Sequence, residues 1–311
     1  MSDQALALAP SNSLVLEPID RRPSLSWSGA AGMLLSLLVI ATALYQIRTL
    51  SISEIVAAVP ASPLFWLIFV VAYLVGPASE WIIFRRLWGV GANAFGALIR
   101  KLIYNELLLG YLGEVYFYGW ARKKLRFVTA PFGAVKDLAL LSAVAGNIMT
   151  LAFLLVAYPY FDLLPVHEHA TAITWSFVFV IGSSFVILFF RRSIFSLDRG
   201  ELAFIFTMQL ARILASVILS AALWHLAMPS APIVLWFVLA TIRLLISRLP
   251  FVPNKDVVFA GVAILVLGKD VEVAALMTAM AALILAAHVL VVAVCAIADL
   301  IKRETNEPAV A

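Results

Sequence analysis

Long apolar runs separated by short polar segments make up most of the chain. A helix needs about 20 mainly apolar residues to cross hydrocarbon about 30 Å thick, and six or seven of these runs qualify. They predict spanning helices over residues 29 to 47, 63 to 84, 131 to 157, 172 to 190, 201 to 226, 231 to 248 and 273 to 298. The pattern is therefore typical of a polytopic membrane protein.

Two further apolar segments are too short or too interrupted to cross. Residues 102 to 119 contain two glutamates and three glycines, and residues 257 to 268 follow Pro250 and Pro253. Interrupted apolar segments in two halves of a chain point to a binding site near the middle of the membrane. The alternative for 257 to 268 is a short loop between ordinary helices. We predict an all-α integral membrane helix bundle of about seven to eight spanning segments plus a re-entrant or broken helix pair.

The ends of the chain differ from this pattern. Residues 1 to 28 are polar, contain three prolines and lack the basic start of a cleaved signal peptide, which predicts a flexible cytoplasmic tail. The expected organisation is this tail, a transmembrane domain over 29 to 300 and a second tail over 301 to 311.

Composition narrows the class of protein. The 311 residues are 64% hydrophobic and 13% charged, with a mean hydropathy of +1.03, which excludes a soluble globular domain. Cys295 is the single cysteine, so neither an intramolecular disulfide nor a Cys-rich metal site is possible within the chain. We expect no cofactor and no metal. We also expect no nucleic-acid partner, because the basic residues fall between apolar runs.

The basic residues predict the orientation instead, since cytoplasmic loops retain Lys and Arg. If the N-terminus is cytoplasmic and residues 102 to 119 enter and leave on one side, 17 of the 22 Lys and Arg residues are cytoplasmic, including Lys101, Arg248 and Lys255. We expect a multi-pass protein of the cell (inner) membrane with both termini in the cytoplasm.

The segment NELLLGYLGEVYFYGWARKK, residues 105 to 124, combines membrane-like apolarity with charge. Gly110 and Gly113 permit close packing and a change of chain direction. A carboxylate in hydrocarbon costs several kcal/mol unless it is paired, protonated or hydrated, so Glu106 and Glu114 indicate an interior polar cavity. The alternative is that both glutamates lie at the cytoplasmic surface, paired with neighbouring basic residues such as Arg122 or Lys123.

Arg212 and Arg243 lie well inside apolar runs. A guanidinium at the centre of a membrane helix costs about 2.5 to 3.5 kcal/mol, so each requires a partner or water. The candidate partners are Glu80, Glu114 and Asp137. Two alternatives remain open: Lys136 and Asp137 neutralise each other, and Arg243 extends to the inner interface.

The two interrupted segments carry a resemblance to the flippase-like family, which comprises the transmembrane region of lysylphosphatidylglycerol synthases and stand-alone relatives. The first resembles the family's Asn plus Leu-Leu-Pro-Gly-Arg-Leu-Gly-Glu element, with Leu109 in place of Pro and Tyr111 in place of Arg. Pro250 and Pro253 match a Pro-x-x-Pro-Gly-Gly element in which Asn254 and Lys255 replace the glycines. The matching residues of the first element are Asn105, Leu107, Leu108, Gly110, Leu112, Gly113 and Glu114.

The resemblance implies movement or handling of a lipid between leaflets: an anionic or aminoacylated phospholipid, or a polyprenyl-linked lipid. The basic residues Arg122, Lys123 and Lys124 would attract anionic headgroups at about 1 kcal/mol each, although ordinary inner-face anchoring also explains such clusters. The expected substrate-binding residues are Glu80, Asn105, Gly110, Gly113, Glu114, Arg212 and Arg243.

Signals for an enzyme are weak, and we expect no catalytic residues. His167 and His169 are two residues apart, whereas helical zinc motifs use a spacing of four. Two other functions stay open: an ion-coupled small-solute transporter with Glu106 or Glu114 as its proton site, and a structural partner of an envelope-synthesis complex. The expected partners are membrane lipids and, for the last hypothesis, an envelope or lipid-synthesis enzyme.

Overall fold

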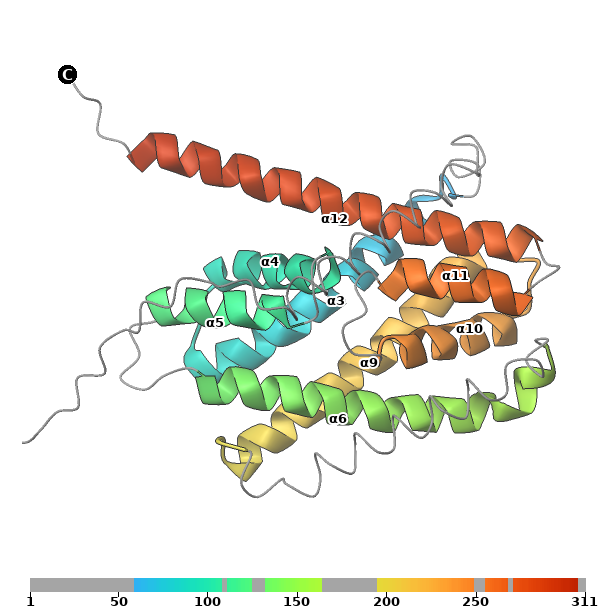
Figure 1. Cartoon of the computed structure of the whole chain (residues 1–311), viewed down its shortest axis with the longest axis horizontal. Coiled ribbons are helices and arrows are strands. Elements are labelled where there is room, and N and C mark those ends of the chain that lie inside the picture. The colour runs from blue at the N-terminus through green and yellow to red at the C-terminus, as the bar shows by residue number, and fades with distance from the viewer. Residues whose placement is uncertain are drawn as a thin grey trace, which may run out of the picture.

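The described part of the chain consists of helices. The computed structural model describes residues 59–107, 111–124, 132–163, 195–248, 255–267 and 271–306, and within these ranges no strand occurs (Figure 1). The predicted tail 1 to 28 and the predicted spans 29 to 47 and 172 to 190 lie outside the described residues.

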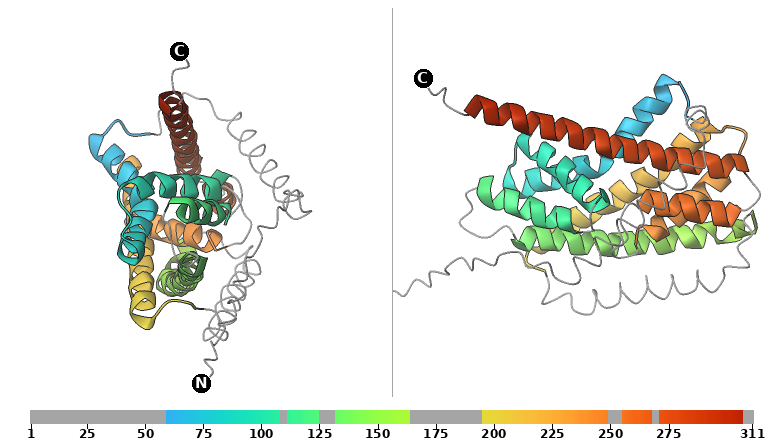
Figure 2. Two further views of the ribbon diagram at one scale, coloured as in Figure 1. Left: turned by 90° about the vertical axis from the view of Figure 1, so that its left-hand side faces the viewer. Right: turned by 45° about the horizontal axis from the view of Figure 1, so that its top comes forward.

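Within the described ranges, four helices are long and apolar enough to cross a membrane. They are α3 (Pro63–Trp88), α6 (Phe132–Ala157), α9 (Arg199–Ala227) and α12 (Val271–Asn306). The short 3-10 helix η1 (Tyr158–Leu163) follows α6. Four of the predicted spans are thus found as long helices, and α12 continues past the predicted domain boundary at residue 300. Figure 2 shows α12 running along the bundle.

Four other helices are too short to cross. They are α4 (Asn93–Leu107), α5 (Leu112–Lys124), α10 (Ile233–Ile246) and α11 (Lys255–Leu267). With 13 to 15 residues each, they rise only about 20 to 22 Å, less than the hydrocarbon thickness. The predicted spanning segment 231 to 248 is therefore corrected: α10 ends after 14 residues, beside polar side chains that line a cavity.

The short helices form two hairpins at opposite ends of the bundle. Helices α4 and α5 run to and from a turn at Tyr111, while α10 and α11 lie at the other end (Figure 1). Tyr111 and Ser247, which follow α4 and α10, line the same cavity, so both hairpins reach it. The break predicted within residues 102 to 119 falls between Leu107 and Leu112.

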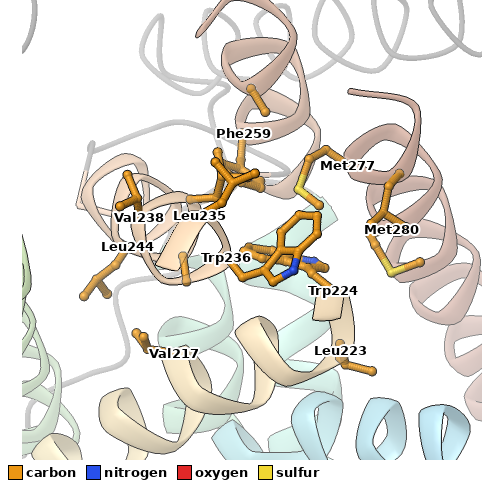
Figure 3. Packing of buried hydrophobic residues seen from close by; sticks show 14 of the residues in the cluster. Val217, Leu223, Trp224, Leu235, Trp236, Val238, Leu244, Phe259, Met277 and Met280 are labelled. Carbon is orange, nitrogen blue, oxygen red and sulfur yellow. The ribbon is translucent and has the colours of Figure 1, made fainter. Parts of the chain in front are cut away.

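Buried aromatic residues fix each hairpin to the long helices. Phe84 of α3 and Phe117 of α5 are fully buried, with ring centroids 4.7 Å apart. At the other hairpin, Trp224 of α9 stacks on Phe259 of α11 at 5.5 Å, and Trp236 of α10 is fully buried beside them (Figure 3). Aromatic pairs of this kind contribute about 0.5–1.5 kcal/mol beyond their burial. Each hairpin therefore has its own apolar anchor.

The α4–α5 hairpin depends on one glycine. A Cβ atom on Gly113 would overlap the backbone oxygen of Lys101 and lie 2.7 Å from the side-chain oxygen of Asn105. Since one of these atoms belongs to the backbone of α4, only movement of a whole helix would make room. Gly113, expected from the sequence to bind substrate, is buried in this helix contact.

We predict that Gly113→Ala destabilises the protein by about 1–3 kcal/mol, the usual cost of overpacking. Thermal unfolding of the purified protein in detergent would measure this. Gly119→Ala is the matched control, because Gly119 lies on α5 and a Cβ atom there would have nothing within 4 Å, so stability should be unchanged or slightly raised. Equal stability of the two variants would contradict the close approach of α4 and α5.

Candidate functional site

The tips of the two hairpins enclose a cavity of about 460 Å³, here called the central cavity. Helices α3, α6 and α9 complete its walls. A cavity of this size is in the range of small-molecule binding sites. Its charged lining residues are Lys101, Arg212, Arg243, Arg248 and Lys255, with Glu80, Glu106 and Glu114.

Asn105 joins the two arms of the α4–α5 hairpin. Its Oδ1 accepts a hydrogen bond from the backbone N–H of Gly113 at 2.7 Å, and its Nδ2 donates to Glu114 Oε1 at 3.3 Å. The first contact satisfies one of the N–H groups left unpaired at the start of α5. The turn also includes Tyr111 at φ +76°, a conformation that is costly for a residue other than glycine. Asn105 thus joins the end of α4 to the start of α5.

Lys101 holds the two neighbouring carboxylates. This lysine is only 4% exposed, and its Nζ lies 2.7 Å from Glu80 and 3.3 Å from Glu114. The alternative pairing of Glu114 with Arg122 or Lys123 is wrong. Both are exposed near the far end of α5, where Lys124 lies about 15 Å along the helix from Glu114.

Arg243 is paired across the second hairpin. Its Nε forms an ion pair with Asp256 Oδ1 of α11, and its Nη1 donates to Ser220 of α9 at 3.4 Å. The ion pair joins the arms α10 and α11 close to their tip. Arg243 thus has a carboxylate partner, as expected for a guanidinium within an apolar run, but the partner is Asp256 and none of the three candidates named from the sequence.

Arg212 has polar neighbours but no carboxylate partner among the described residues. It donates to Gln209 at 2.8 Å and to Ser142 of α6 at 3.1 Å. The acidic partners expected from the sequence are engaged elsewhere: Glu80 and Glu114 bind Lys101. The third, Asp137, accepts two backbone N–H bonds at 2.7 and 2.8 Å and lies 3.5 Å from Lys136, as one alternative proposed.

Arg248 fits against a glycine of α6. A Cβ atom on Gly146 would overlap the guanidinium of Arg248. Arg248 also donates to the hydroxyl of Ser247, and Lys255 donates to the Ser247 backbone oxygen at 2.8 Å. Within the described chain, no carboxylate forms an ion pair with Arg212, Arg248 or Lys255. We call these three residues the basic trio.

The structure brings five of the seven expected binding residues together. Glu80, Asn105, Glu114, Arg212 and Arg243 all line the central cavity. The exceptions are Gly113, in the helix contact, and Gly110, which lies outside the described residues. Arg122, Lys123 and Lys124 do not line the cavity.

Sequence reasoning missed Lys101, Arg248, Lys255 and Asp256 as site residues. The three basic residues were assigned to cytoplasmic loops, whereas the structure places them in the central cavity. Asp256 follows Pro253 by three positions and would have been the natural partner for Arg243, had α10 and α11 been recognised as a hairpin. In the part of the chain that the structure describes, no group of three His, Cys, Asp or Glu residues is arranged to hold a metal ion.

None of the family models, curated proteins or solved structures compared with this chain matches it.

The Arg243–Asp256 pair gives a direct test of this geometry. We predict that Asp256→Asn lowers the free energy of unfolding by about 1–3 kcal/mol, because it leaves a partly buried guanidinium without its carboxylate. The double variant Arg243→Met, Asp256→Leu should recover much of this loss, since an apolar pair needs no charge partner. Thermal unfolding in detergent measures both. A double variant no more stable than Asp256→Asn would contradict the pairing.

Proposed function

We propose that this chain is a lipid-handling membrane protein that moves a lipid with an anionic headgroup between leaflets through the central cavity. The basic trio supports this proposal most directly. Arg212, Arg248 and Lys255 lie in the cavity and form no ion pair with a carboxylate in the described chain. Cationic groups away from bulk water favour an anion that supplies the missing charge.

The charge balance of the cavity favours an anion over a neutral ligand. Lys101 is engaged with two carboxylates and Arg243 with Asp256. Of the remaining charged lining residues, three are basic and only Glu106 is acidic. Arginine presents several N–H donors in a planar fork, which suits phosphate oxygens. The shared chemistry of the proposed ligands is thus a phosphodiester or phosphate headgroup.

The surrounding helices suit a ligand with acyl or polyprenyl chains. The exposed surfaces of α3 and α9 include the large apolar residues Leu67, Val70, Leu214 and Ile218, which can face lipid. Such a lipid would keep its charged headgroup among polar side chains in the cavity. Its chains would stay in the hydrocarbon and would not be exposed to water. The resemblance to the flippase-like family points to the same class of ligand.

The orientation is part of the proposal. Arg86, near the end of α3, forms a 3.0 Å ion pair with Glu201, near the start of α9. The basic end of α5 and the end of α12 lie at the same end of the bundle (Figure 1). By the preference of Lys and Arg for the cytoplasm, we assign this end to the cytoplasmic face of the cell inner membrane, with both termini there.

Reconstitution separates this function from its alternatives. Proteoliposomes containing fluorescent phosphatidylglycerol, and others containing fluorescent phosphatidylcholine, are treated with an impermeant quencher to follow exchange between leaflets. We expect faster exchange of the anionic lipid than in protein-free vesicles. Uptake of a soluble solute without lipid exchange would favour the small-solute transporter. The absence of any flux, together with co-purification of an envelope-synthesis enzyme, would favour the structural partner.

We predict that Arg212→Ala slows exchange of phosphatidylglycerol at least about tenfold, because a charge-assisted hydrogen bond contributes about 1.5–3 kcal/mol. Membrane insertion and thermal stability should be retained, since no buried ion pair is broken. The control is Arg199→Ala, an exposed position at the start of the same helix, which should exchange lipid at the wild-type rate. Wild-type exchange by Arg212→Ala would refute the assignment.

We also predict that Gly146→Ala slows exchange by about tenfold, because the added methyl group displaces the Arg248 guanidinium from its place against α6. Gly76→Ala is the matched control: Gly76 lines the same cavity, and a Cβ there would have nothing within 4 Å. The same exchange assay compares the two. Equal rates would show that the position of Arg248 is unimportant for transfer.

A further inference from the structure

A second cavity of about 150 Å³, here called the side cavity, adjoins the central cavity. The two share five lining residues, of which Glu106 and Arg243 are charged. The side cavity is further lined by Asp256 of α11, Tyr73 of α3 and His288 of α12. Tyr73 and His288 are hydrogen-bonded to each other at 2.9 Å. Polar side chains therefore line both cavities.

Glu106 differs from the other carboxylates of this region. Glu80 and Glu114 bind Lys101, and Asp256 binds Arg243. Glu106 forms no ion pair with any residue in the described ranges, and no described side chain donates a hydrogen bond to it. A carboxylate away from water that lacks a direct partner changes its protonation state readily when a neighbouring charge changes.

Charged and titratable groups surround Glu106 from several helices. The strongest electrostatic influences on it are Asp256, Lys255 and Arg243. The charged and titratable groups that line the two cavities around it are Tyr73 and Glu80 on α3, Lys101 on α4, Tyr111 and Glu114 at the start of α5, Arg212 on α9, Arg243 and Arg248 on and after α10, Lys255 and Asp256 on α11, and His288 on α12. Two of the cations, Arg243 and Lys255, belong to the α10–α11 hairpin, as does Arg248 just after α10. An anion bound there would interact with Lys255 and Arg243, the two cations that otherwise stabilise the ionised form of Glu106.

From this arrangement we infer that Glu106 is a proton site coupled to the ligand: it takes up a proton when an anionic headgroup binds in the central cavity and releases it when the headgroup leaves. The inference rests on the proposed function and adds a proton as the coupled ion. A bound anion disfavours a second negative charge beside it, so binding favours protonated Glu106. By reciprocity, protonation of Glu106 strengthens binding of the anion. Affinity should therefore be highest at acidic pH and fall as pH rises.

The test uses the full-length protein in detergent and short-chain dihexanoyl phosphatidylglycerol, whose phosphodiester stays singly negative over the range used. Titration calorimetry in two buffers of different ionisation enthalpy gives the protons taken up per lipid bound. We expect uptake approaching one proton for the wild type. We also expect a Kd that rises between about pH 5 and pH 8, by at most about tenfold per pH unit.

Glu106→Gln should bind the lipid without proton uptake and with a Kd that no longer changes with pH. Glu114→Gln, in the same cavity but on the Lys101 side, should retain the pH dependence, and the surface variant Glu201→Gln should behave as the wild type. Wild-type binding without proton uptake, or pH dependence that survives in Glu106→Gln, would overturn the inference and leave the proposed function standing. No binding of the anionic lipid by the wild type would overturn both.

Discussion

Backbone groups at the end of a helix cannot be left unpaired inside hydrocarbon, and this constraint governs both hairpins. Each of the four short helices in the described part of the chain has one end beside the central cavity. At the first tip, Asn105 accepts a hydrogen bond from the start of α5. At the second, Lys255 donates to the carbonyl of Ser247 at the end of α10. In each hairpin, a polar side chain of one arm satisfies the backbone of the other. Polar residues are therefore required at the tips for structural reasons.

The same constraint creates the electrostatics of the central cavity. Lys255, which satisfies a helix end, also brings a charge to the central cavity, where the other charged side chains lie, and charge in such a place needs compensation. Lys101 compensates two glutamates, and Asp256 compensates Arg243. The basic trio is not compensated in this way by the described residues, and Gly146 leaves room for its Arg248 guanidinium. A structural requirement thus produces a site with an excess of positive charge, which is the basis for proposing an anionic ligand.

The sequence predicted the long helices well because their signal is local: an apolar run of sufficient length has few other stable forms in a membrane. It also predicted that Asn105, Glu114, Arg212 and Arg243 would share a cavity, since charge inside an apolar run requires a polar interior. The length of α10 was mispredicted, because the apolar run from 231 to 248 looks like a complete span. Pairings such as Lys101 with Glu80 depend on helix packing, which no local pattern encodes.

The central claim is that two incomplete helical hairpins meet in the interior of the membrane. The most direct measurement is the depth of nitroxide labels on single cysteines, introduced into a Cys295→Ser background and read by paramagnetic relaxation in nanodiscs. Labels at Tyr111 and Ser247 should both lie near the bilayer centre, while labels at Lys124 and Ile233, at the outer ends of the hairpins, should lie near the surfaces. Surface depths at Tyr111 and Ser247 would contradict the account.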